Sequence, residues 1–137
     1  MDEIDRRIIE ILRKNGRMPF TKLAERLGIT EGAVRHRVKS LTARGIIKRF
    51  TLEISEEGTT TLIGMKTNPK INLQELCSKI LKIKEVERVF EITGDLDLIA
   101  IVRSTNPQNL NRIVDSLRSI PGVTSTISYL VLKEYGD

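Results

Sequence analysis

The chain has 137 residues, and its 23 Lys and Arg outnumber its 18 Asp and Glu to give a formal net charge of +5. A single cysteine, Cys77, excludes an internal disulfide, and its place among aliphatic residues at helical spacing favours a buried role. No apolar run approaches the roughly 20 residues that span a bilayer, so the composition excludes a transmembrane helix and predicts a cytoplasmic protein.

The first third of the chain predicts three helices. Residues 2–14 place aliphatic side chains on one face and acidic residues in the first turn, where the helix dipole favours them. A second helix is expected over residues 19–27, and Gly28 can adopt the positive φ that ends a helix sharply. A third helix begins after Thr30, whose hydroxyl can cap it, and ends at Gly45.

The second and third helices, with a glycine turn between them, have the spacing of a helix-turn-helix motif, whose second helix enters the major groove of DNA. The side of the third helix that faces the other helices is apolar. An arginine guanidinium on its other side can form paired hydrogen bonds to a guanine edge or contact a phosphate. The residues that we predict to bind DNA are Thr30, Glu31, Gly32, Arg35, His36, Arg37 and Lys39.

A solvated surface helix that happens to be basic is the alternative for this segment, and a charge run alone would favour it. The helix–glycine–helix frame and the cap at Thr30 reverse that preference and favour DNA. His36 keeps two interpretations, a base or phosphate contact and an idle surface position.

The positive charge is concentrated in the N-terminal half. Residues 1–50 hold 13 Lys and Arg against 6 Asp and Glu, a net charge of +7, whereas residues 51–137 hold 10 against 12, a net charge of −2. This asymmetry is expected when only one half touches a polyanion. An anionic membrane surface is disfavoured because no predicted helix combines a broad Lys/Arg face with Trp or Phe.

After Gly45 the apolar period changes to two. Ile47, Phe50, Leu52 and Ile54 alternate with polar residues, which predicts a strand. We assign residues 50–60 to a hinge strand and linker, which join a DNA-binding domain of residues 1–49 to a second domain of residues 61–137.

The second domain contains an internal repeat with a period of 37 residues, in which eight apolar pairs share one register, from Met65 with Val102 to Phe90 with Ile127. Each unit predicts a strand, a helix and a strand, over residues 61–67, 72–83 and 86–93 and again over residues 98–104, 107–119 and 123–133. Two such units give a ferredoxin-like βαββαβ domain with both helices on one face, so the whole chain is predicted to be α+β.

The predicted strand over residues 98–102 is apolar at every position, which implies that both of its faces are hidden from water. Two helices cover only one face of the sheet. We therefore expect a second copy of the chain to cover the other face and form a homodimer. A dimer would carry two helix-turn-helix motifs to half-sites about one helical turn apart.

Several motifs, in this order, add to that interpretation: residues 2–5, 23–28, 33–41 with 45–47, 94–97 and 121–123. Together they resemble the Lrp/AsnC, or feast/famine, family of transcriptional regulators over nearly the whole chain. The resemblance implies a transcriptional regulator that dimerises through its C-terminal domain and in many members forms tetramers or octamers.

The resemblance also implies an amino-acid effector bound at the interface between C-terminal domains. The matching residues are Gly94, Asp95, Leu96, Asp97, Thr126 and Ser128. Gly94 permits close approach of a ligand, and either aspartate can pair with an α-ammonium, although the same residues also suit a plain hairpin turn. Leu96 stands where the family often has an aromatic residue, and Ser128 stands where it usually has Thr. Either difference can alter which effector fits, or accompany a loss of sensing.

Three other functions compete with that of a DNA-binding regulator. An enzyme or cofactor protein is not expected, because the only histidine, His36, lies among arginines and no metal-ligand cluster, phosphate loop or dinucleotide motif occurs. An RNA-binding βαββαβ module would place aromatic residues on its sheet, and residues 98–103 contain none. An effector-independent architectural protein that coats DNA remains the alternative to a sequence-specific regulator.

Overall fold

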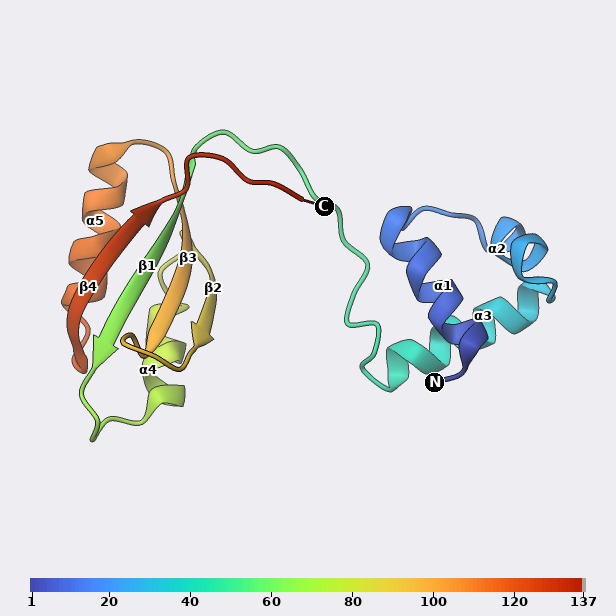
Figure 1. Ribbon diagram of the computed structural model, residues 1–137, viewed down its shortest axis with the longest axis horizontal. Coiled ribbons are helices and arrows are strands. Elements are labelled where there is room, and N and C mark those ends of the chain that lie inside the picture. The colour runs from blue at the N-terminus through green and yellow to red at the C-terminus, as the bar shows by residue number, and fades with distance from the viewer. Residues whose placement is uncertain (137) are drawn as a thin grey trace. The chain divides into compact units, whose positions relative to one another are not determined.

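The computed structural model describes residues 1–136 and divides into two compact units (Figure 1). The first unit, Met1–Ser55, is helical, and the second begins at Glu56 and combines a sheet with two helices. No helix in residues 1–136 is both long enough and apolar enough to cross a membrane.

The first unit contains α1 (Glu3–Lys14), α2 (Phe20–Leu27) and α3 (Glu31–Ala43). As predicted, Gly28 ends α2 with a φ of 66°, and the Thr30 hydroxyl caps α3 by accepting a hydrogen bond from the Ala33 amide at 3.1 Å. Apolar side chains of the three helices meet in one core, formed by Ile8, Leu12, Leu23, Ala24, Val34 and Val38. The three-helix prediction is confirmed.

The strand predicted over residues 47–54 is wrong for the single chain, because residues 48–56 have no regular structure. A strand needs a neighbouring strand to accept its backbone hydrogen bonds, and the described first unit contains no strand. Its apolar residues are consequently uncovered: Phe50, Leu52 and Ile54 are 54%, 74% and 57% exposed.

The second unit is an antiparallel sheet with strand order β2-β3-β1-β4, which confirms the ferredoxin-like prediction. Its elements in chain order are β1 (Thr59–Thr67), α4 (Leu73–Ile80), β2 (Val86–Glu91), β3 (Leu98–Ser104), α5 (Pro107–Arg118) and β4 (Val123–Leu130).

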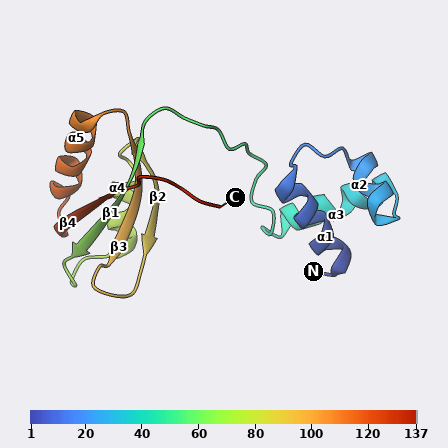
Figure 2. The ribbon, with the colours of Figure 1, turned by 45° about the horizontal axis from the view of Figure 1, so that its top comes forward.

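Both helices cover the same face of the sheet (Figures 1 and 2). The core between the two layers contains Ile63 and Met65 from β1, Leu98, Ala100 and Val102 from β3, Leu76 and Ile80 from α4, and Ile113 and Leu117 from α5. Alternation along each strand therefore sends the intervening residues to the other side.

That other side, here called the open face, carries an apolar patch of Leu62, Phe90, Ile99, Ile101, Ile127 and Tyr129, and Arg88 lies at its β2 edge, with its guanidinium carbon 5.2 Å from the centroid of the Phe90 ring. The pairs Leu62–Tyr129, Leu62–Ile101 and Phe90–Ile99 are cross-strand neighbours, so these side chains form one contiguous patch. Phe90, Ile127 and Tyr129 are 42%, 44% and 50% exposed. The single chain thus covers one face of its sheet and leaves an apolar face uncovered.

Candidate DNA-binding and effector-binding sites

The outer side of α3 carries most of the residues predicted to bind DNA. Thr30, Glu31 and Gly32 form the start of the helix, and Arg35, His36 and Lys39 follow along its exposed surface. An added Cβ on Gly32 would meet nothing within 4 Å, so the surface around the first turn of α3 is open. This arrangement presents donors and cations together, as a helix that enters a groove requires.

Arg35 is held in place on this surface by two neighbours. Its Nη2 donates a hydrogen bond to Glu31 Oε1 at 2.8 Å, one helical turn earlier. Its guanidinium carbon lies 5.3 Å from the centroid of the Phe20 ring, at the start of α2, which is within cation–π range. Sequence reasoning did not identify Phe20 as part of the site; an aromatic residue at the first turn of the preceding helix was the available signal.

Arg37, by contrast, turns away from the exposed side of α3 toward the start of α1. Its Nη1 donates to Asp2 Oδ2 at 2.6 Å and to Asp5 Oδ1 at 3.1 Å, and only 29% of its side chain is exposed. The hydrogen bond from Arg37 holds the pKa of the Asp2 carboxyl below its usual range, and the same bond raises the pKa of Arg37. Arg37 therefore joins α3 to α1 and is not grouped with Arg35 and Lys39.

The loop of residues 94–97 connects β2 to β3. Gly94 has a φ of 126°, which only glycine adopts without strain. The carboxylate of Asp97 accepts hydrogen bonds from the Thr67 amide at 2.8 Å and the Thr67 hydroxyl at 3.2 Å, so this aspartate fixes the loop to β1. Asp95 is exposed.

The remaining predicted effector residues do not converge on one cavity in the single chain. Thr126 and Ser128 pair with Met65 and Ile63, so they lie on the helix side of the sheet. There the Thr126 hydroxyl accepts a hydrogen bond from Arg118 Nε at 3.1 Å.

Leu96 lies on the opposite side of the sheet, over Gly64 of β1. A Cβ built on Gly64 would be 2.4 Å from Leu96 Cδ1 and 3.1 Å from Ile127 Cγ2. The missing side chain of Gly64 therefore makes room for Leu96 at the edge of the open face. No group of three His, Cys, Asp or Glu residues suited to a metal ion occurs in the part of the chain that the structure describes.

Two family models match the chain in the order of its two units. A model described as winged helix-turn-helix DNA-binding matches residues 1–48, and one described as the Lrp/AsnC ligand binding domain matches residues 60–137. The chain belongs to the Lrp/AsnC family. The N-terminal unit of this Lrp/AsnC protein thus corresponds to the DNA-binding model, and the C-terminal unit corresponds to the model of the ligand binding domain.

Relatives of known name agree with this placement in the Lrp/AsnC family. The HTH-type transcriptional regulator LysM of Sulfurisphaera tokodaii is 48% identical over 134 residues, which cover 97% of this chain and 96% of LysM. The HTH-type transcriptional regulator FL11 of Pyrococcus abyssi is 36% identical over 140 residues, which cover 100% of this chain and 93% of FL11. The relatives are transcriptional regulators, so the rival prediction of an enzyme is set aside.

Solved structures of transcriptional regulators share the fold over nearly the whole chain. A transcriptional regulator of Neisseria meningitidis in complex with L-Met superposes with a TM-score of 0.91 at 26% identity and covers 100% of this chain and 93% of that one. AsnC of E. coli superposes with a TM-score of 0.87 at 22% identity and covers 98% and 93%. The chain is a DNA-binding transcriptional regulator of the Lrp/AsnC type.

Proposed function

We propose that this regulator recognises a specific DNA sequence as a homodimer, with α3 in the major groove, and that an amino acid bound between C-terminal units modulates it. The observation that carries the proposal is the fixed position of Arg35. A guanidinium already held by Glu31 and Phe20 loses little rotamer freedom when it meets a base edge. Prepositioning of this kind favours readout of a base over loose contact with the backbone.

Of the other residues of the motif, some are assigned to contacts with DNA and Arg37 is assigned to holding the helices together. Thr30, Glu31 and Gly32 bring the amino end of α3, with its open surface, close to the DNA. His36 and Lys39 lie on the same exposed side, where Lys39 serves as a phosphate contact. Arg37 enters the proposal as a positioning residue, because it holds α1 against α3.

The open face supports a homodimer. All four strands contribute apolar residues to it, with Arg88 at the β2 edge, and its central residues Ile99 and Ile101 are only half-buried in the single chain. Burial of apolar surface contributes roughly 25 cal/mol per Å², and a stable interface needs about 800 Å² from each partner. A second copy of the same face supplies a matching apolar partner with twofold symmetry.

An amino-acid effector is supported by the L-Met complex of the Neisseria meningitidis regulator, which shares the fold at 26% identity. In this chain the exposed carboxylate of Asp95 can pair with an α-ammonium, and Gly94 lets a ligand approach the backbone. Leu96, Asp97, Thr126 and Ser128 complete the proposed effector set. Because the six residues lie on both sides of one sheet, we infer that neighbouring subunits complete the site.

DNA footprinting, together with competition by random DNA, tests the proposal. We expect two protected half-sites about one helical turn apart and an operator affinity at least 10³-fold above that for random DNA. One unrepeated contact site would contradict the dimer. Equal affinity for operator and random DNA would instead support the architectural alternative. Footprints recorded with and without each amino acid test the effector.

A further inference from the structure

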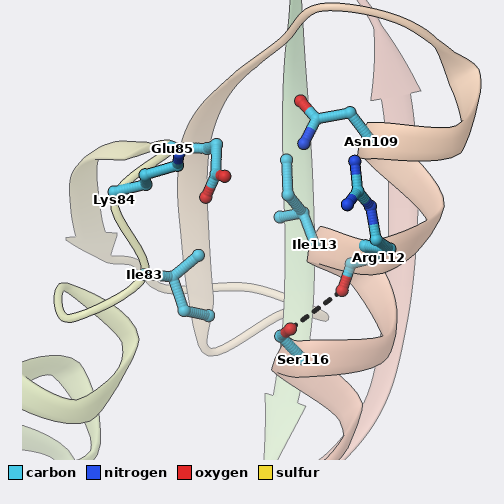
Figure 3. Close-up of a pocket in the computed structure, with 7 residues that line it drawn as sticks. All are labelled: Ile83, Lys84, Glu85, Asn109, Arg112, Ile113 and Ser116. Atoms are coloured by element: carbon cyan, nitrogen blue, oxygen red, sulfur yellow. Dashed lines mark hydrogen bonds between the residues drawn. The ribbon is translucent and has the colours of Figure 1, made fainter.

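A shallow groove on the helix side of the second unit has no part in the function proposed above. It lies between the start of β2 and α5 and has a volume of about 250 Å³ (Figure 3). Lys84 and Glu85 line it on the β2 side, Asn109 and Arg112 line it on α5, and Ile83 and Ile113 supply apolar surface between them.

The groove is separate from both surfaces of the second unit that the proposed function uses. Ile113 belongs to the core beneath the helices, so the groove opens on the side of the sheet opposite the open face. The groove adjoins the first residue of β2, whereas the loop of residues 94–97 follows the last. A strand of six residues separates its two ends by about 20 Å. Pairing of two open faces therefore leaves the groove accessible.

Opposite charges lie on the two walls of the groove without pairing with each other. The Glu85 carboxylate extends from the β2 side and the Arg112 guanidinium stands on α5 (Figure 3), and within residues 1–136 neither forms an ion pair. Both charges are therefore available to a ligand that carries complementary charges.

Hydrogen bonds fix the walls in this arrangement. The Glu85 carbonyl accepts a bond from the Arg103 amide at 3.0 Å, which holds the start of β2 to β3. The Ser116 hydroxyl donates to the Arg112 carbonyl at 2.9 Å. The Asn109 side-chain oxygen accepts from the Thr105 amide at 3.0 Å, which leaves its NH₂ group directed toward the groove (Figure 3). The α5 wall thus offers donors, and the β2 side offers the Glu85 carboxylate as an acceptor, with Lys84 beside it.

We propose that this groove binds a small zwitterion, whose carboxylate lies on Arg112 and Asn109 and whose ammonium lies on Glu85. A free α-amino acid carries these two charges on groups bonded to one carbon, and charge-assisted hydrogen bonds to each are the strong kind. The volume of about 250 Å³ falls just below that of pockets for drug-sized ligands, so it suits a molecule of amino-acid size. Ile83 and Ile113 provide contact for an aliphatic side chain.

Titration calorimetry of the full chain with the twenty amino acids tests this inference, in an Asp95→Asn background that weakens the effector site at residues 94–97. At least one aliphatic amino acid should bind, and Glu85→Gln and Arg112→Gln should each weaken it at least tenfold. Lys82→Gln removes an exposed charge just outside the groove and should change nothing. Circular dichroism confirms that each variant folds.

A second comparison separates a zwitterion site from a site for a simple ion. Isobutylamine and isovalerate each carry one of the two charges of valine or leucine on a similar carbon skeleton, and each should bind at least tenfold more weakly than the amino acid. The inference is overturned if none of the twenty amino acids binds, if Arg112→Gln and Glu85→Gln leave binding intact, or if isovalerate alone binds as well as the amino acid. DNA affinity, measured in parallel, reports separately on the proposed function.

Discussion

The helices of the first unit and the sheet of the second unit leave opposite kinds of surface uncovered. In the first unit the core residues Ile8, Leu23 and Val34 are fully buried, and the exposed side of α3 carries Arg35 and Lys39. In the second unit two helices complete the core on one face of the sheet and leave the apolar open face without cover. The three helices of the first unit bury their own core and offer charge to a polyanion, whereas the sheet of the second unit offers apolar surface that another copy can bury.

A charge placed on the open face should have the largest effect, because it disrupts the apolar surface that the second copy is expected to bury. Ile101→Lys puts an ammonium at the centre of the patch, where burial without a partner is costly. We expect the dimer to dissociate at micromolar concentration in analytical ultracentrifugation. Because two linked motifs gain roughly 10² to 10⁴ in affinity over one, operator binding should fall by about that factor.

Leu81→Lys is the matched control for Ile101→Lys. Leu81 is also a large apolar residue, 50% exposed, but it follows α4 on the helix side of the unit. A cation at a helix C-terminus is compatible with the helix dipole, so this variant should fold and remain dimeric. Dissociation of both variants, or of neither, would show that the open face is not the interface.

Separate substitution of Arg35 and Lys39 distinguishes base readout from phosphate contact on the exposed side of α3. Arg35→Ala should cost about 1–3 kcal/mol in operator binding and relax the preference for one base pair, because Arg35 is the fixed guanidinium. Lys39→Ala should weaken operator and random DNA alike and reduce the salt slope by about one. Filter binding at several salt concentrations measures both, and the reverse pattern would exchange the two roles.

The Phe20 ring allows the positioning of Arg35 to be tested without removing its charge. Phe20→Leu keeps an apolar residue at the start of α2 but removes the ring over which the guanidinium lies. Loss of a cation–π contact at an exposed site should cost about 0.5–1 kcal/mol of operator affinity and should leave the salt dependence of binding unchanged. In the Arg35→Ala background the same change should have no further effect, and an additive loss would argue against the contact.

Sequence periodicity was sufficient for the elements and the layers. The stripe along α3 and the repeat of 37 residues predicted the helix-turn-helix and the βαββαβ unit, because period-3.6 and period-2 patterns record which face is buried. The alternation over residues 47–54 has the composition of a strand, yet composition does not supply a neighbouring strand, and the single chain offers none.

Pairing between distant side chains was not predictable in the same way. Arg37 and Asp2 are 35 positions apart, and nothing in a basic helix distinguishes an arginine that faces DNA from one that reaches another helix. Glu85 and Arg112 likewise lie on separate elements, and only the fold brings them to one groove. Such contacts depend on the crossing of elements, which leaves no periodic trace in the sequence.

The smallest expected effect comes from the link between α1 and α3. Because the hydrogen bond from Arg37 lowers the pKa of Asp2 in the folded chain, its stabilising contribution is present above the unfolded value of about 3.9 and is lost as the pH falls through the lower folded value. Asp2→Asn keeps a capping side chain for α1 but removes the charge. Urea denaturation from pH 6 to pH 3 should therefore show less acid destabilisation in Asp2→Asn than in the unsubstituted protein.

Glu53→Gln is the control for this comparison, since Glu53 is an exposed carboxyl outside the described helices and strands, and it should leave the pH profile unchanged. If Asp2→Asn and the unsubstituted protein lose stability in parallel down to pH 3, the Arg37–Asp2 bond does not persist in solution. Arg37 would then be free to turn outward, and the exposed side of α3 would gain a third cation beside Arg35 and Lys39. Its role would return to DNA contact, and Arg37→Ala would weaken operator binding directly.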